Sequence, residues 1–223
     1  MQRPEEIRAN LTAVERRIEA ACQRAGRRRE EITLVAVSKT FPAGDVEAAV
    51  AAGASDVGEN RVQEARDKKP AVAAGARWHL IGHLQSNKAK DAVRLFEVIH
   101  TIDSESLAER VGRAAAAAGK VQEVLIEVNI GREPQKAGID PADADAMTRS
   151  LRAIEALSLT GLMTIPPQGD AEEMRPYFRE LRKMKDDLGL AHLSMGMTDD
   201  FEVAIEEGAT IIRVGRAIFG TRG

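Results

Sequence analysis

The sequence predicts an α/β fold, a (β/α)8 or TIM barrel with an extra N-terminal helix. Short apolar, β-branched segments alternate with helical segments eight times along the 223 residues. No linker, repeat or low-complexity segment divides the chain, so residues 1–223 are expected to form a single domain. An open doubly wound sheet uses the same alternation. Here, however, the first strand is followed by Lys39-Thr40-Phe41-Pro42 and not by a glycine-rich dinucleotide fingerprint.

The first predicted element is a helix that begins after Pro4 and ends at Gly26. Glu5 and Glu6 lie in its first turn, where the helix dipole favours acidic residues. The apolar segments predict strands at 32–38, 55–58, 77–82, 97–102, 123–129, 159–163, 191–195 and 210–214. Helices are expected between them, including 104–118, 141–156, 172–188 and 199–207, with N-caps at Ser104 and Asp199 and stops at Gly119, Gly189 and Gly208.

The composition excludes several classes of protein. Basic and acidic residues nearly balance, 32 against 35, and aromatic residues make up only 3%, so no nucleic-acid partner is expected. The run Arg27-Arg28-Arg29 is followed by two glutamates, which predicts a solvated turn. The single Cys22 excludes an internal disulfide. Because no apolar run approaches membrane length, we expect a cytoplasmic protein with no membrane partner.

The carboxyl ends of the predicted strands carry the candidate functional residues, as is usual in such barrels. Lys39 ends the first strand. If it points inward, burial lowers its pKa toward the state that attacks an aldehyde and forms a Schiff base. The alternative is a lysine that extends into solvent. The other ends carry Gly58-Glu59-Asn60, Gly82-His83, Asp103, Asn129, Met163-Thr164, Ser194-Met195-Gly196-Met197 and Gly215-Arg216.

The last two strand ends have the character of a phosphate site. The segment from Ser194 to Thr198 supplies hydroxyl and backbone N–H groups, and Gly215 allows close backbone approach before a short helical turn. Either loop alone could simply end a strand. Both together, opposite an inward lysine, favour a phosphorylated aldehyde as ligand. Met163, Met195 and Met197 are expected either to fill the core or to line this pocket.

Arg213 interrupts the last apolar strand, where a buried guanidinium requires a partner. It has the same side-chain parity as Gly215, which allows it to point into the barrel beneath the phosphate loop. A pyridine nitrogen that accepted its hydrogen bond would stay unprotonated, because arginine holds its proton. The open alternative is an outward Arg213 paired with a helix carboxylate. His79 and His83 have the spacing of a zinc helix but lie on a strand, ~13 Å apart, so no metal site is predicted.

Six motifs occur in order along the whole chain. They are Ala36-Val37-Ser38-Lys39-Thr40, Gly58-Glu59-Asn60, Trp78-His79-Leu80-Ile81-Gly82 with Leu84-Gln85-Ser86-Asn87-Lys88, Gly161-Leu162-Met163-Thr164, Ser194-Met195-Gly196-Met197 and Ile212-Arg213-Val214-Gly215. Together they resemble the pyridoxal 5′-phosphate homeostasis proteins, relatives of the barrel half of alanine racemase. The resemblance implies a fold-type III barrel that holds pyridoxal 5′-phosphate (PLP) as a covalent aldimine on Lys39.

The resemblance also implies the remaining cofactor contacts. Ser194, Gly215 and Arg216 are expected at the phosphate, and Arg213 at the pyridine nitrogen. Many relatives carry Ser or Thr at the position of Arg216, so the contact expected there is its backbone N–H. Lys136 matches a second lysine near the cofactor. The motif residues Asn60, Met163 and Met195 are predicted to border it.

The sequence favours a carrier over a catalyst. We predict a PLP-binding protein of intracellular PLP homeostasis, a monomer, with PLP-dependent apoenzymes as recipients. The alternative is a PLP-dependent enzyme similar to the amino-acid racemases. The alanine racemases use a tyrosine on one face of the substrate and have a second domain that these 223 residues do not include. The single tyrosine here, Tyr177, lies in a predicted helix away from every strand end. A class I aldolase-type enzyme is a third reading.

Overall fold

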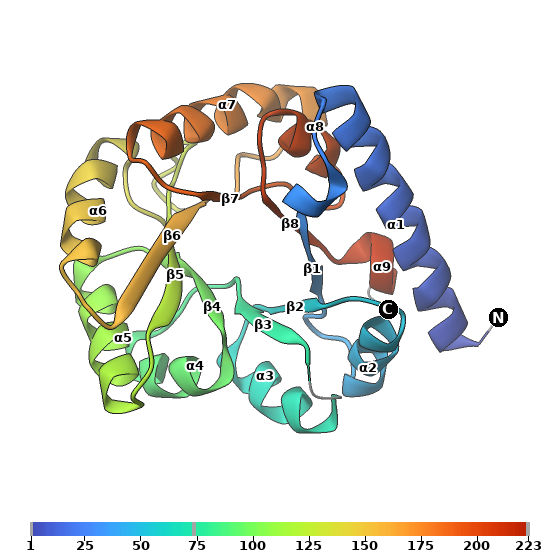
Figure 1. Cartoon of the computed structure of the whole chain (residues 1–223), viewed down its shortest axis with the longest axis horizontal. Coiled ribbons are helices and arrows are strands. Elements are labelled where there is room, and N and C mark those ends of the chain that lie inside the picture. The colour runs from blue at the N-terminus through green and yellow to red at the C-terminus, as the bar shows by residue number, and fades with distance from the viewer. Residues whose placement is uncertain (1, 73–74, 222–223) are drawn as a thin grey trace.

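The computed structural model describes residues 2–72 and 75–221 (Figure 1). Within these residues, eight parallel strands pair in chain order and close into a barrel, which confirms the predicted (β/α)8 fold. The strands are β1 (Thr33–Val37), β2 (Asp56–Glu59), β3 (Arg77–Leu80), β4 (Val98–Ile102), β5 (Gln122–Glu127), β6 (Leu157–Met163), β7 (His192–Ser194) and β8 (Ile211–Val214).

The helices surround the barrel (Figure 1). Those that follow the strands in turn are α2 (Ala43–Ala51), α3 (Val62–Lys68), α4 (Ala89–Leu95), α5 (Glu105–Ala117), α6 (Ala144–Arg152), α7 (Ala171–Asp187), α8 (Phe201–Glu206) and α9 (Arg216–Phe219). The predicted helix at 141–156 is shorter, because its first residues form a 3-10 turn and it ends at Arg152. Ser104 is the N-cap of α5, as predicted, and accepts a hydrogen bond from Leu107 N.

The predicted N-cap at Asp199 was wrong. Asp200 is the residue that precedes α8, and its carboxylate accepts the backbone N–H of Met197 at 2.6 Å. This hydrogen bond closes the turn that precedes α8. Asp200, one position after the predicted N-cap, therefore fixes the start of the helix.

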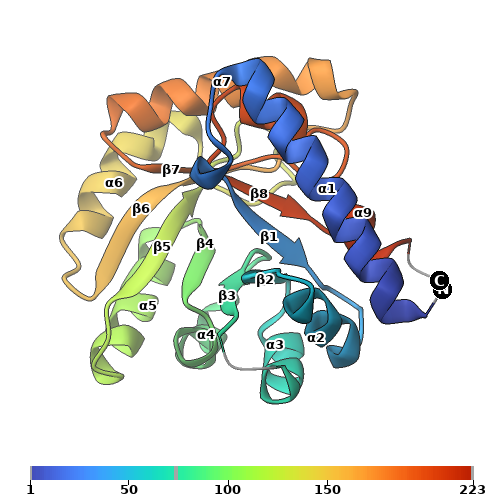
Figure 2. The same ribbon diagram turned by 45° about the vertical axis from the view of Figure 1, so that its right-hand side comes forward.

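The predicted extra helix is α1 (Arg3–Ala25), which starts one residue before Pro4. One face of α1 is buried, through Ile7, Leu11, Val14, Ile18, Ala21 and Cys22. This face packs on α8, α2 and α9. Because α9 is a single turn, α1 occupies the place of the eighth outer helix, between α8 and α2 (Figures 1 and 2).

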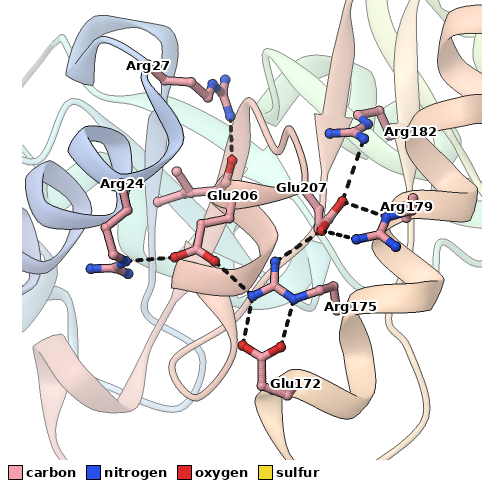
Figure 3. Close-up of polar contacts among 9 residues, drawn as sticks. Arg24, Arg27, Glu172, Arg175, Arg179, Arg182, Glu206 and Glu207 are labelled. Atoms are coloured by element: carbon pink, nitrogen blue, oxygen red, sulfur yellow. Dashed lines mark hydrogen bonds and ion pairs between the residues drawn. The ribbon is translucent and has the colours of Figure 1, made fainter.

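An ion-pair network joins α7 to α8 and α8 to α1 (Figure 3). Arg175 of α7 pairs with Glu172 in its own first turn and with Glu206 and Glu207 at the end of α8. The Glu206 carboxylate also accepts Arg24 of α1 at 2.8 Å. Only about 5% of Glu207 is exposed, so its charge is partly desolvated and its partners are held in place.

The Arg27–Arg29 run is solvated only in part. Arg28 is exposed, as the charges of the run predict. Arg27 donates to the backbone carbonyls of Ile205 and Ala209, at 2.9 and 2.6 Å, and so fastens the end of α1 to the segment between α8 and β8. Arg29 makes a two-bond contact with Glu15 of α1, at 2.7 and 2.9 Å.

Inside the barrel, a small apolar cluster is formed by Val35, Val98, Leu125, Met163 and Ile211. On β8, the next residue on the same inward face after Ile211 is Arg213, which lies nearer the carboxyl end of the strand. Within the described residues, no helix is long and apolar enough to cross a membrane.

Candidate functional site

A cavity of about 200 Å³ opens at the carboxyl ends of β1, β2, β3 and β8. Its lining includes five of the predicted site residues, namely Lys39, Asn60, Arg213, Gly215 and Arg216. The residues that complete the lining are Val37, Ile81, Ile165, Met197, Thr198 and Asp199. The structure therefore brings the lysine, the arginine and the glycine loop of the sequence analysis to one place.

A buried ion pair holds the backbone just before Lys39. The ammonium group of Lys68 donates to the carbonyl oxygen of Ser38 at 2.8 Å and to Glu59 Oε1 at 2.7 Å. The hydroxyl group of Ser38 donates to the same carboxylate oxygen at 2.6 Å. Glu59 is fully buried, and burial raises its pKa, while Lys68 and Ser38 act in the opposite direction.

The backbone just after Lys39 is held by the same group of charges. Glu64 accepts the N–H of Thr40 at 2.7 Å and the ammonium of Lys68 at 3.1 Å. Burial alone would raise the pKa of Glu64, but these hydrogen bonds lower it. Thr40 has a φ of 71°, a conformation in which a β-branched residue is strained. The charged cluster thus fixes the sharp turn at which Lys39 leaves the strand.

Arg213 lies in the wall of the cavity and points into the barrel, not toward a helix carboxylate. It is only 3% exposed. Its Nη1 donates to Ser194 Oγ at 2.6 Å and its Nη2 to the carbonyl of Thr164 at 2.9 Å. Burial lowers the pKa of this guanidinium to about 10, against the attraction of Asp200 and Glu127. It therefore stays a cation at neutral pH.

Four of the nine predicted cofactor contacts lie outside the lining of this cavity, namely Lys136, Met163, Ser194 and Met195. Met163 and Met195 are fully buried in the core, and Ser194 is fully buried with its hydroxyl on Arg213. Their contact with a cofactor stays a prediction. The hydroxyl that does line the cavity belongs to Thr198. Thr198 belongs to the loop predicted to hold the phosphate, whereas the predicted contact there was Ser194.

Arg216 and Asp199 form an ion pair at the mouth of the cavity. Both side chains also line a second cavity of about 570 Å³, together with Lys136. Lys136 pairs with Glu133 and donates to the carbonyl of Pro166 at 3.0 Å. The two lysines that the sequence singled out thus line adjoining cavities that share part of their lining.

The roles of Lys68 and Glu59 were not predicted from the sequence. Glu59 lies within the motif Gly58-Glu59-Asn60, but the motif alone indicates no role for its carboxylate. The available signal was a lysine four residues after Glu64 on a short helix, which is also the pattern of an ordinary surface pair. Across the described residues, no group of three or more His, Cys, Asp or Glu side chains could hold a metal ion.

Known proteins resemble this chain over nearly its whole length. The protein-family model described as the N-terminal domain of alanine racemase matches residues 9–223. The pyridoxal phosphate homeostasis protein of Aquifex aeolicus is 43% identical over 95% of this chain and 96% of its own length. That of Escherichia coli K12 is 40% identical, over 97% of each chain. This chain belongs to the pyridoxal phosphate homeostasis protein family.

Solved structures share the barrel fold of this chain. PipY of Synechococcus elongatus, in a structure with PLP bound, is 37% identical, has a TM-score of 0.85 and covers 96% of this chain and 100% of its own. An alanine racemase of Clostridium difficile is 14% identical, with a TM-score of 0.76 over 98% of this chain and 57% of its own. The second likeness shows the shared barrel fold.

Proposed function

We propose that this chain binds PLP as a Schiff base on Lys39 and acts in PLP homeostasis as a carrier rather than a catalyst. The observation that carries the proposal is Lys39 at the end of β1, lining a cavity with the buried cation Arg213 in its wall. Membership of a family that includes PLP-bound PipY supports it. When bound, PLP supplies an aldehyde that condenses with an amine, with loss of water.

The donors around the cavity suit the other groups of PLP. Arg213 faces the cavity with a guanidinium that only donates hydrogen bonds, which suits an unprotonated ring nitrogen. Thr198 supplies a hydroxyl group, and the N–H groups of Arg216 and Ala217 begin α9, where no helical acceptor exists for them. A Cβ at Gly215 would lie 3.1 Å from the carbonyl of Val37, so a side chain there would crowd the strand end. These groups suit a phosphate.

The decisive experiment is an absorption spectrum of the purified protein after incubation with PLP, recorded beside Lys39→Ala. The wild type is expected to gain the band of a protein-bound Schiff base, and borohydride reduction followed by peptide mapping should place the adduct on Lys39. Lys39→Ala should show neither. A colourless wild type, or an adduct on another lysine, would overturn the proposal.

Lys136 is proposed as the residue that assists transfer to recipient apoenzymes. Its cavity adjoins that of Lys39, and its amine is held beside Glu133 and the carbonyl of Pro166. Lys136→Ala is expected to slow loading and release of PLP, followed by absorbance after mixing with a PLP-dependent apoenzyme. Unchanged rates in both directions would remove Lys136 from the proposal.

A racemase of the alanine racemase kind would need a tyrosine beside the cavity, on one face of the substrate. Tyr177 lies on α7 and packs against the hydrophobic core, and it is not part of the lining of either cavity. We therefore expect no interconversion of amino-acid enantiomers by the PLP-loaded protein. Chiral chromatography after incubation with single amino acids tests this, and turnover of any of them would favour an enzyme.

A further inference from the structure

A chain of four buried side chains crosses the interior of the barrel and ends at Arg213. Asp56 Oδ1 lies 2.8 Å from His79 Nε2, and His79 Nδ1 lies 2.9 Å from His100 Nε2. His100 Nδ1 lies 2.9 Å from Ser194 Oγ, the oxygen to which Arg213 donates. Both imidazole rings are fully buried.

The chemistry of the groups fixes the direction of every proton in this chain. Arg213 can only donate, so Ser194 Oγ accepts from it. In the part of the chain that the structure describes, the other hydrogen-bond partner of Ser194 Oγ is His100 Nδ1, so the hydroxyl proton goes there. His100 then carries its own proton on Nε2 and donates to His79 Nδ1, and His79 donates from Nε2 to Asp56.

Independent features agree with this direction. Burial holds the pKa of His100 well below its ordinary value, so the ring is neutral and can accept. Burial alone would raise the pKa of Asp56, but hydrogen bonds from His79 and Ser55 lower it, so the carboxylate is an anion that accepts. Between a guanidinium that only donates and a carboxylate that only accepts, one arrangement of the protons satisfies every hydrogen bond of the chain.

The two ends of the chain reach opposite faces of the barrel. Arg213 lines the cavity at the carboxyl ends of the strands. Asp56 is the first residue of β2 and lines a separate cavity of about 210 Å³ at the amino ends of β1 and β2. The chain therefore links the candidate site to a carboxylate on the far side of the barrel.

We propose that Asp56, His79, His100 and Ser194 form a positioning relay that holds Arg213 as a hydrogen-bond donor toward the candidate site. The proposal rests on the proposed function for its ligand, since the donor would meet the ring nitrogen of PLP. Ser194 thereby acts on the site through Arg213, in place of the phosphate contact that the sequence suggested. His79 and His100 set the direction in which Ser194 donates.

The first test uses the protein without PLP and so does not depend on the proposed function. Nitrogen-15 NMR of histidine-labelled protein should show His79 and His100 as neutral rings with the proton on Nε2. In Asp56→Asn, the His79 proton loses its anionic acceptor, and a second population with the proton on Nδ1 should appear. A charged His100, a His100 proton on Nδ1, or no change in Asp56→Asn would overturn the relay.

The second test measures the affinity for PLP by absorbance titration. His100→Leu is expected to weaken binding at least tenfold and to shift the absorption maximum of bound PLP. His100→Asn, which keeps an acceptor oxygen near Nδ1, should stay within about threefold of the wild type. Equal loss in both variants would show that His100 serves only to fill space, and it would overturn the proposal.

Ser194→Ala should behave like His100→Leu, because it removes the atom that Arg213 contacts. Thr148→Val is the matched control, since Thr148 is also a buried hydroxyl and has no hydrogen-bond partner among the described residues. It should leave PLP affinity unchanged. Thermal unfolding of each variant without PLP shows whether it is folded. If the wild type failed to bind PLP, the proposed function would fall, while the histidine NMR would still decide for or against the relay.

Discussion

Removal of the Lys68 ammonium is the most direct test of the charged cluster beside Lys39. Lys68→Met keeps the apolar part of the side chain but leaves the Glu59 carboxylate, which is fully buried, without its cation. Breaking a buried ion pair in this way typically costs about 3–5 kcal/mol. We expect a loss of this size in the free energy of unfolding at pH 8, measured by urea denaturation.

The pH dependence of that loss follows from the direction in which the pKa of Glu59 is shifted. Burial already raises the pKa of Glu59, and without Lys68 it should rise further. A carboxyl group whose folded pKa lies above its unfolded value lowers stability as pH rises from the unfolded to the folded pKa. Lys68→Met should therefore be closest to the wild type near pH 5, where Glu59 can hold a proton, and furthest from it at pH 8.

Two controls make the result specific to the cluster. Lys90→Met removes an exposed lysine of α4 and should change stability by less than about 0.5 kcal/mol. In the double variant Lys68→Met with Glu59→Gln, the stranded charge is gone, so part of the loss should be recovered. A loss below about 1 kcal/mol at pH 8, or equal losses at both pH values, would refute the reasoning.

Three further outcomes follow from other parts of the structure. Burial raises the pKa of Glu127 to about 7. Glu127→Gln should therefore raise the free energy of unfolding at pH 8 by up to about 3 kcal/mol and should hardly change it at pH 4.5. Equal effects at both pH values in urea titrations would contradict this. A Cβ at Gly82 would lie 2.4 Å from the carbonyl oxygen of Asn60, so Gly82→Ala should weaken both folding and PLP binding, whereas Gly44→Ala, with open space around it, should not. Arg175→Ala should lower stability by about 1–2 kcal/mol, and this loss should shrink in 1 M salt; a salt-independent loss would show that packing dominates.

The sequence predicted the parts of the site that depend on strand order. Because the carboxyl ends of parallel strands meet at one face, Lys39, Asn60 and Gly215 could be placed together from their positions alone. Parity allowed an inward Arg213, since alternate residues of a strand share one face, but it left an outward Arg213 open, and the buried contacts with Ser194 and Thr164 decide between the two. These predictions needed only the one-dimensional pattern.

What the sequence could not supply was the identity of partners across the barrel. Ser194 faces the interior of the barrel and lies below the cavity. Thr198 reaches the cavity because Gly196, at a φ of 92°, turns the chain after β7. His100 meets Ser194 from a strand 94 residues away. Such contacts follow from barrel closure and register, which side-chain type alone does not encode.

The position of α1 has a consequence for the order in which this chain can fold. The helix that comes first in the chain packs on α8 and α9, which come last, and the Asn10 side chain donates to the carbonyl of Ile218, 208 residues later. During synthesis, the part of the apolar stripe of α1 that faces α8 and α9 therefore stays uncovered until residues 201–219 have left the ribosome. The closing step docks α1 on α8 and α9, and a nascent protein halted before α8 would present this part of the stripe to chaperones.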